Sequence, residues 1–277
     1  MIGNLEGNVK KVLTLVAVLM IVAVAGLFAQ AAAQQAETPQ TAADLIKAGD
    51  EAYVKFDDAE ALKQYEQAAK LDPNSYEALW KTSRAYLDVG DRIDPKRKDA
   101  EKEMIKYYMA CEDFAKKAIK VNPNDTWGYF CDAAGMGKHV LLLSKKQQVA
   151  MSKKIKIQID KAIALDPKND LAWHALGIWQ TTMAEIGGAE RFFGGILFGS
   201  IPKGTFAEAV KAFKAAIEIK SNYTNHHLEL GRTYVAMKKK DLAAQEFQTS
   251  ADCPILTSKC ADYIVEAKAE LAKLKKK

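Results

Sequence analysis

The chain repeats one order of small, aromatic and helix-ending residues along most of its length. In the first unit, Gly49 is followed twelve residues later by Ala61. Tyr65 and Ala68 come next, and Pro73 closes the unit. Small residues let two helices pack closely, an aromatic side chain fills the space between them, and proline stops the second helix. The order therefore predicts helix–turn–helix units that bury their apolar faces against one another.

The same order recurs further along the chain. Pro123 and Pro167 take the place of Pro73 in later units, and Ser221 takes it in the fourth. The run WHALG at residues 173–177 marks the first helix of one unit. These features resemble the tetratricopeptide repeat (TPR), a helix pair of 34 residues. The resemblance implies an all-α fold: a TPR-like α-α superhelix, a right-handed solenoid with helical insertions and a C-terminal cap helix.

Successive helix-ending positions lie more than one repeat length apart, which predicts insertions between paired helices. We expect five TPR-like repeats over residues 42–257. Inserts are expected near residues 91–106, 138–150 and 182–203. Residues 258–277 are expected to form the cap helix, since a solenoid needs a polar-faced element over its last repeat.

The third insert is the most individual segment of the chain. It contains Arg191, then Leu-Phe-Gly at residues 197–199 with Pro202, and then Thr205 ahead of the Glu-Ala pair at residues 208–209. In these features the chain resembles the regulator of microtubule dynamics family. The resemblance implies a TPR-like helical domain with an adapter role. We do not carry microtubule association over to this chain, because its N-terminus resembles an export signal.

Residues 12–28 form an uncharged apolar run that follows Lys10 and Lys11, and small residues in an A-x-A pattern come after it. A basic, then apolar, then small-residue order is typical of a secretory signal peptide. We therefore expect residues 1–33 to be a signal peptide and residues 34–41 a polar spacer. The expected localisation is exported, either periplasmic or secreted. The alternative is a membrane anchor formed by residues 12–28, and we expect membrane association only if this segment is retained.

Charge and cysteine content restrict the partners and the redox state. The net charge of +5, from 40 basic and 35 acidic residues, is too small to indicate nucleic-acid binding, and we expect none. We expect Cys111 and Cys131 to be buried free thiols, because both lie on apolar helix faces. A local bridge between Cys253 and Cys260 stays open, because four cysteines allow three connectivities.

The segments that come nearest to known catalytic or cofactor-binding motifs lack the residues that those motifs require. The segment GMGKH at residues 135–139 lacks the spacing and the Ser or Thr of a phosphate-binding loop. His226 and His227 are adjacent and point about 100° apart on a helix, which does not suit a shared metal. We expect no enzyme activity, no cofactor and no metal site.

The remaining function is binding. We expect an exported TPR scaffold or adapter that binds a protein or peptide in its concave groove, where first helices of the pairs present residues three to four apart. Trp and Arg are common anchors of binding hot spots, although Trp80 is also suited to packing between repeats and His174 to a place in the core. The expected groove residues are Trp80, Lys81, Arg84, Phe130, His174, Ile178, Leu228 and Arg232.

The glycine-rich apolar insert, residues 187–204, supports an alternative function. It is a poor solvent-exposed loop, because it combines six glycines with large apolar side chains. It could pack back on its own solenoid, dock a partner or a membrane, or cover the groove of a small-molecule or lipid carrier. The candidate insert or lid residues are Arg191, Phe192, Phe193, Leu197 and Phe198.

Overall fold

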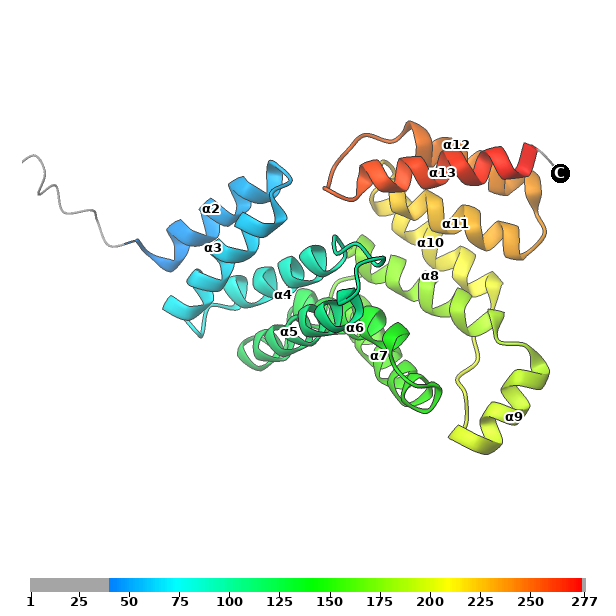
Figure 1. The fold of residues 1–277 in the computed structure, drawn as a ribbon, viewed down its shortest axis with the longest axis horizontal. Helices are drawn as coiled ribbons and strands as arrows, with labels where there is room; N and C mark the ends of the chain where they lie inside the picture. Colours follow the sequence, from blue (N-terminus) through cyan, green and yellow to red (C-terminus); the bar gives the residue numbers. More distant parts are fainter. Residues whose placement is uncertain (1–39, 276–277) are drawn as a thin grey trace, which may run out of the picture. The chain divides into compact units, whose positions relative to one another are not determined.

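The computed structural model describes residues 40–275, and these residues form helices and connecting segments with no strand. The expected signal peptide or anchor, residues 1–33, lies outside the described residues, as does most of the expected spacer. The α-helices are α2 (Ala42–Val54), α3 (Asp58–Leu71), α4 (Tyr76–Gly90), α5 (Ala100–Val121), α6 (Thr126–His139), α7 (Lys145–Leu165), α8 (Asp170–Glu185), α9 (Gly188–Phe198), α10 (Phe206–Ile219), α11 (Thr224–Ala236), α12 (Lys240–Asp252) and α13 (Cys260–Lys275). The expectation of an all-α, TPR-like helical solenoid is confirmed (Figure 1).

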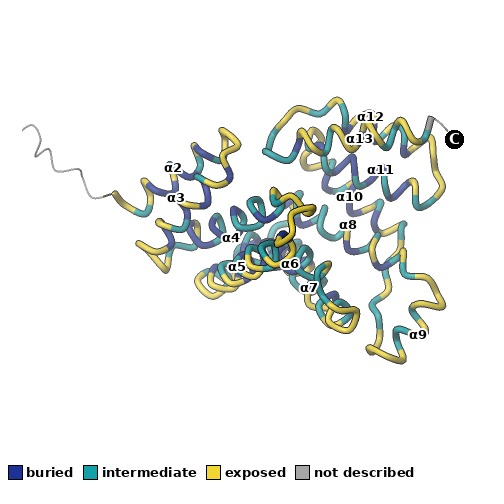
Figure 2. The backbone as a smooth tube through the Cα atoms, in the orientation of Figure 1, coloured by how far each residue is buried: buried dark blue, intermediate teal, exposed yellow. Residues whose placement is uncertain are grey.

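The helices pack as five successive pairs. Within the pairs, α2 packs on α3, α4 on α5, α6 on α7, α8 on α10, and α11 on α12. The first helices of the pairs also contact one another in order, from α2 through α4, α6 and α8 to α11. Figure 2 shows the buried positions along the lines where helices meet. The first helices therefore form one continuous row, and side chains along this row can act together.

Glycine positions explain how closely paired helices approach. A Cβ atom added to Gly177 in α8 would lie 2.6 Å from the ring of Phe213 in α10. A Cβ atom added to Gly231 in α11 would lie 2.6 Å from the ring of Phe247 in α12. Both rings are fully buried. The aromatic ring thus occupies the space that a side chain on the facing helix would need, as the repeat pattern predicts.

Additional segments lie between the two helices of three pairs. Residues 91–99 connect α4 to the long helix α5, and a 3₁₀ turn, Val140–Leu142, precedes α7. The third additional segment contains α9, between α8 and α10. At the other end of the chain, α13 packs on α11 and α12 and covers the last apolar cluster. Between residues 40 and 275, no helix combines the length and the apolar character that crossing a membrane requires.

All four cysteines are free. Cys111 and Cys131 are buried, as expected, and burial raises the pKa of the Cys131 thiol to about 12. Cys253 and Cys260 do not form the local bridge that their spacing left open.

Candidate functional site

A cationic and aromatic cluster lies where α2, α4 and α6 meet. We call Tyr53, Trp80, Arg84 and Trp127 the Arg84 cluster. Trp80 of α4 stacks on Trp127 of α6, with ring centroids 4.7 Å apart and an interplanar angle of 17°. The Arg84 guanidinium lies 5.2 Å from the Tyr53 ring centroid and 5.8 Å from that of Trp127, and its Nη2 donates a 2.6 Å hydrogen bond to the Tyr53 hydroxyl. Cation–π contacts and this hydrogen bond hold Arg84 in one orientation.

The Arg84 side chain is enclosed but still reachable, with 23% of its surface exposed. Burial acts against its charge, yet nearby Tyr53, Asp88 and Tyr223 raise the pKa of Arg84 above its usual value. The guanidinium is therefore always charged. It has five N–H donors, and the Tyr53 hydroxyl takes one of them. The other donors are suited to a carboxylate or another oxyanion, which arginine binds through two parallel hydrogen bonds.

Asp88 is the acidic neighbour of Arg84, one helical turn further along α4. Its Oδ2 lies 3.8 Å from Arg84 Nε, and that oxygen is buried without a hydrogen bond among the described residues. Burial raises the pKa of Asp88 to about 7, although the Arg84 charge acts in the opposite direction. The net charge of the site therefore becomes more positive as the pH falls through neutrality.

We expect Asp88→Asn to stabilise the protein at pH 8 by about 2 kcal/mol and to have little effect at pH 4. Folding raises the pKa of Asp88 from roughly 4 to about 7. The folded wild-type protein therefore becomes less stable as the pH rises through this range, because the buried carboxyl has to ionise. Asparagine removes the cost of the buried charge. Urea unfolding at both pH values measures the difference, and an equal effect at the two values would contradict the role given to Asp88.

Three of the expected groove residues are already engaged by neighbouring side chains. Lys81 is 14% exposed and forms 2.7 Å ion pairs with Asp50 and Glu77. Arg232 pairs with Glu229 and with Glu266 of the cap helix. His174 packs edge-on against Phe213, and its Nδ1 lies 3.1 Å from Nδ1 of His226. Burial lowers the pKa of His174 well below its usual range, so it is neutral at pH 7.

Two expected groove residues lie in the core instead, which corrects their assignment. Phe130 is buried in a cluster with Ala115 of α5 and Ala162 of α7. Leu228 is fully buried with Phe213 and Phe247. Both side chains point between helices, so they cannot line a binding surface. Of the other expected residues, Trp80 and Arg84 come together in the Arg84 cluster, and Ile178 is partly exposed on α8.

The sequence reasoning missed Tyr53 and Trp127. Trp80 and Phe130 each lie seven residues after a helix-ending proline, and this equivalence placed Phe130 in the groove. In the structure, Trp127, nearly one helical turn before Phe130, stacks on Trp80. A search for aromatic residues within one turn of the equivalent position would have found it. Tyr53 carries no comparable signal.

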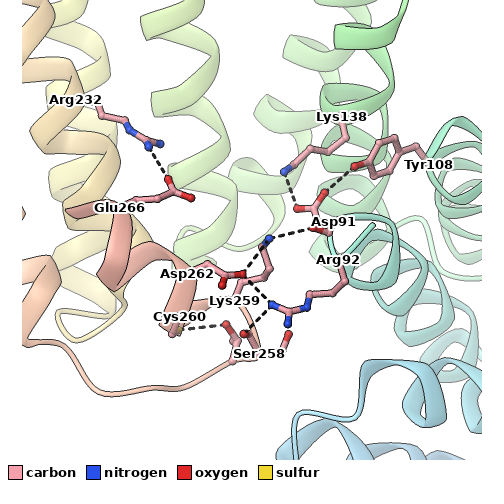
Figure 3. A network of polar contacts seen from close by, with 11 residues as sticks. Asp91, Arg92, Tyr108, Lys138, Arg232, Ser258, Lys259, Cys260, Asp262 and Glu266 are labelled. Atoms are coloured by element: carbon pink, nitrogen blue, oxygen red, sulfur yellow. Dashed lines mark hydrogen bonds and ion pairs between the residues drawn. The ribbon is translucent and has the colours of Figure 1, made fainter. Parts of the chain in front are cut away.

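A second polar arrangement joins the end of α4 to the segment before α13 (Figure 3). The Asp91 carboxylate accepts hydrogen bonds from the Tyr108 hydroxyl at 2.9 Å and from Lys138 Nζ at 2.6 Å. Lys259 Nζ donates to the Asp91 backbone carbonyl at 3.0 Å. Arg92 pairs with Asp262 at 2.8 Å. We call these residues the Asp91 network, and it connects the second helix pair to the C-terminal cap.

The insert does not cover the row of first helices, which corrects its expected role as a lid. Figure 1 shows α9 apart from α4 and α11, and α9 contacts α7 and, through Arg191, the end of α8. Arg191 lies on the protein side of α9, where its guanidinium donates hydrogen bonds to backbone carbonyls of Met183, Ile201 and Pro202. Phe192, Phe193, Leu197 and Phe198 are exposed.

No group of three His, Cys, Asp or Glu side chains within residues 40–275 is arranged to hold a metal ion. His226 and His227 are instead bonded to separate acidic partners. His226 Nε2 lies 3.0 Å from Asp170, and His227 Nδ1 lies 2.7 Å from Glu246.

Known proteins similar to this chain give one family and one fold. The family described as "Regulator of microtubule dynamics protein 1-3" matches residues 45–275. Regulator of microtubule dynamics protein 1 of Mus musculus is 32% identical over 173 residues, covering 61% of this chain and 54% of that protein. The Bos taurus protein of the same name is 29% identical over 214 residues, covering 76% of this chain and 66% of that protein. The chain thus spans about half to two thirds of the length of these relatives.

Among solved structures, a thermophilic TPR protein from Thermus thermophilus aligns with a TM-score of 0.62 at 15% identity. The alignment covers 84% of this chain and 100% of that protein. At this identity the likeness shows the fold alone, and it agrees with the order of helix pairs described above.

The relatives and the structure each correct one expectation from the sequence. They are animal proteins named as regulators of microtubule dynamics, so the expectation of an exported, periplasmic or secreted scaffold is wrong. The carrier alternative also loses its support, because the insert does not close over the row of first helices. The match extends over residues 45–275, nearly all of the described chain. The chain therefore belongs to the regulator of microtubule dynamics protein 1-3 family.

Proposed function

We propose that this chain is a protein-interaction scaffold that binds a segment of its partner at the Arg84 cluster. The observation that carries the proposal is the enclosed Arg84 guanidinium, which keeps N–H donors available beside the stacked Trp80–Trp127 pair. An acidic side chain of the partner would bind the guanidinium, and an adjacent apolar side chain would pack on the indole rings. Arginine and tryptophan in enclosed positions dominate many protein interfaces.

The fold and the family both support binding as the activity. TPR proteins present the first helices of their pairs to partners, and α2, α4 and α6 supply the cluster from three successive pairs. A site built from three repeats is suited to a partner segment that contacts all three repeats at once. The family's members are regulators by name, which agrees with a role exerted through bound proteins rather than through catalysis.

Tubulin is the first partner to test, because the relatives are named as regulators of microtubule dynamics. Since the chain spans only part of their length, this assignment is a proposal about the shared region. The Arg84 cluster would then hold an acidic segment of tubulin or of a protein bound to it.

We expect Arg84→Gln to weaken binding of the full chain to purified tubulin at least roughly tenfold, since a charged hydrogen-bonded contact contributes about 1.5–3 kcal/mol. Arg97→Gln is the matched control, because Arg97 is exposed and pairs only with Glu103 among the described residues. Microtubule co-sedimentation and fluorescence titration with tubulin dimers measure the affinities, and thermal unfolding checks that both variants fold.

The proposal fails if wild-type chain does not bind tubulin or microtubules in either assay. It also fails if Arg84→Gln and Arg97→Gln bind equally well. Arg84→Lys should fall between wild type and Arg84→Gln, because lysine keeps the charge but loses the planar pair of donors.

A further inference from the structure

Helix α9 presents an apolar face to solvent. At 100° per residue, Phe192, Phe193, Ile196 and Leu197 fall within an arc of about 140°. Each of these four side chains is between 62% and 69% exposed. None of the residues of α9 is buried, and Figure 2 shows no buried position along this helix. A cluster of four large apolar side chains on one exposed helix marks a docking surface.

Contacts on the opposite face of α9 fix this outward orientation. Arg191 is bonded there to the backbone carbonyls of the segments that enter and leave the helix. Gly194 faces Ile201, and a Cβ atom on Gly194 would lie 2.9 Å from Ile201 Cδ1. Ile201 in turn packs against the cluster of Trp179 and Met183. Arg191 and Gly194 therefore face the protein, and Phe192, Phe193, Ile196 and Leu197 face away from it.

The neighbouring helix supplies positive charge. The N-terminal part of α7 carries four exposed lysines and no acidic residue between positions 145 and 159. No ion pair involves any of the four among the described residues. Met151 and Ile155 of this part of α7 pack in the same cluster as Ile201, and α7 contacts α9, so this part of the helix lies beside the insert. These lysines are Lys145, Lys146, Lys153 and Lys154.

We propose that α9 and the N-terminal part of α7 form a docking surface for an anionic lipid membrane. The four apolar side chains of α9 would enter the boundary between headgroups and acyl chains, and the lysines would contact the anionic headgroups. Interfacial helices combine these two features, and their binding depends on both apolar area and anionic lipid. A protein groove would match the apolar face but would leave the unpaired lysines unexplained.

The test uses the full chain with an environment-sensitive fluorophore on α9. Ala189→Cys places the label on the apolar face and keeps all four large side chains. Cys253→Ser in the same chain removes the most exposed native thiol, and the other three cysteines are buried. Gln245→Cys on α12, also exposed, carries the control label. The probes are phosphatidylcholine vesicles with and without 30% phosphatidylserine.

We expect the emission of the label at position 189 to shift to the blue and to rise roughly threefold with anionic vesicles, as for a helix entering the interface. The label at position 245 should not respond. Phe193→Asp together with Leu197→Asp should abolish the rise without unfolding the protein, because α9 buries no side chain. Lys153→Glu together with Lys154→Glu should reduce it several-fold.

Four outcomes would overturn the proposal. The first is an unchanged label at position 189 with anionic vesicles. The second is an equal rise with neutral and anionic vesicles, which would remove the role of the lysines. The third is an equal response at position 245. The fourth is a blue shift without vesicles that grows with protein concentration, which would assign the apolar face to a second copy of the chain.

Discussion

Gly177→Ala should lower the free energy of unfolding by about 2 kcal/mol, although alanine is the better helix former. The new Cβ atom would lie 2.6–2.7 Å from three carbons of the Phe213 ring, which is fully buried between α8 and α10. Neither helix can move apart without opening the clusters on both sides. Urea or thermal unfolding of the full chain, followed by circular dichroism, measures the change.

Gly137→Ala is the matched control for this substitution. Gly137 also lies in a first helix, α6, but nothing lies within 4 Å of the Cβ atom that alanine would add. We expect this variant to be more stable than wild type by roughly 0.5–1 kcal/mol, from helix propensity alone. Phe213→Leu should make Gly177→Ala less damaging in the double variant, because the smaller side chain leaves room. Equal effects at Gly177 and Gly137 would show that the pairs do not pack as described.

Asp91→Ala should lower the free energy of unfolding by about 2–3 kcal/mol, because it removes the carboxylate that accepts hydrogen bonds from both Tyr108 and Lys138. The Asp91 side chain is only 13% exposed, and Tyr108 is buried, so water cannot fully replace the lost contacts. Asp91→Asn should cost less, since the amide oxygen can still accept the tyrosine hydrogen bond. Chemical unfolding at low and high salt provides the measurement.

Asp262→Ala is the control within the same network. Asp262 is 48% exposed, and its ion pair with Arg92 is a surface contact. We expect Asp262→Ala to lower the free energy of unfolding by less than about 1 kcal/mol, and we expect added salt to make this decrease smaller still. If Asp262→Ala destabilises the chain as much as Asp91→Ala, the exposed ion pair stabilises the protein as much as the enclosed carboxylate, which would contradict this account of the network.

The repeat pattern made the fold predictable, because each helix pair is specified by residues that lie close together in the sequence. Close packing of Gly231 on Phe247 joins residues 16 positions apart, the same spacing as Gly49 and Tyr65, and the sequence displays that spacing directly. The bounds of the insertions, which rest on the same arithmetic, stay a prediction. The sequence could not show that α9 turns its apolar face outward, because that orientation depends on Arg191 bonding to backbone carbonyls.

The site was only partly predictable, because repeats of one pattern do not expose equivalent positions equally. Trp80 and His174 keep partly exposed side chains, whereas Phe130 and Leu228 at matching positions are buried between helices. The contact of Asp91 with Lys259 joins residues 168 positions apart, and no local pattern predicts such a pairing. Long-range contacts of this kind follow from the path of the whole solenoid.

Hydrogen exchange of the full chain with and without saturating tubulin tests the central claim most directly. If a partner binds at the Arg84 cluster, backbone amides of residues 76–90 in α4 and 126–139 in α6 should exchange more slowly in the complex. The same protection should be lost in Arg84→Gln at equal tubulin concentration. Protection confined to other helices while tubulin is bound, or protection of α4 that persists in Arg84→Gln, would contradict the proposed site.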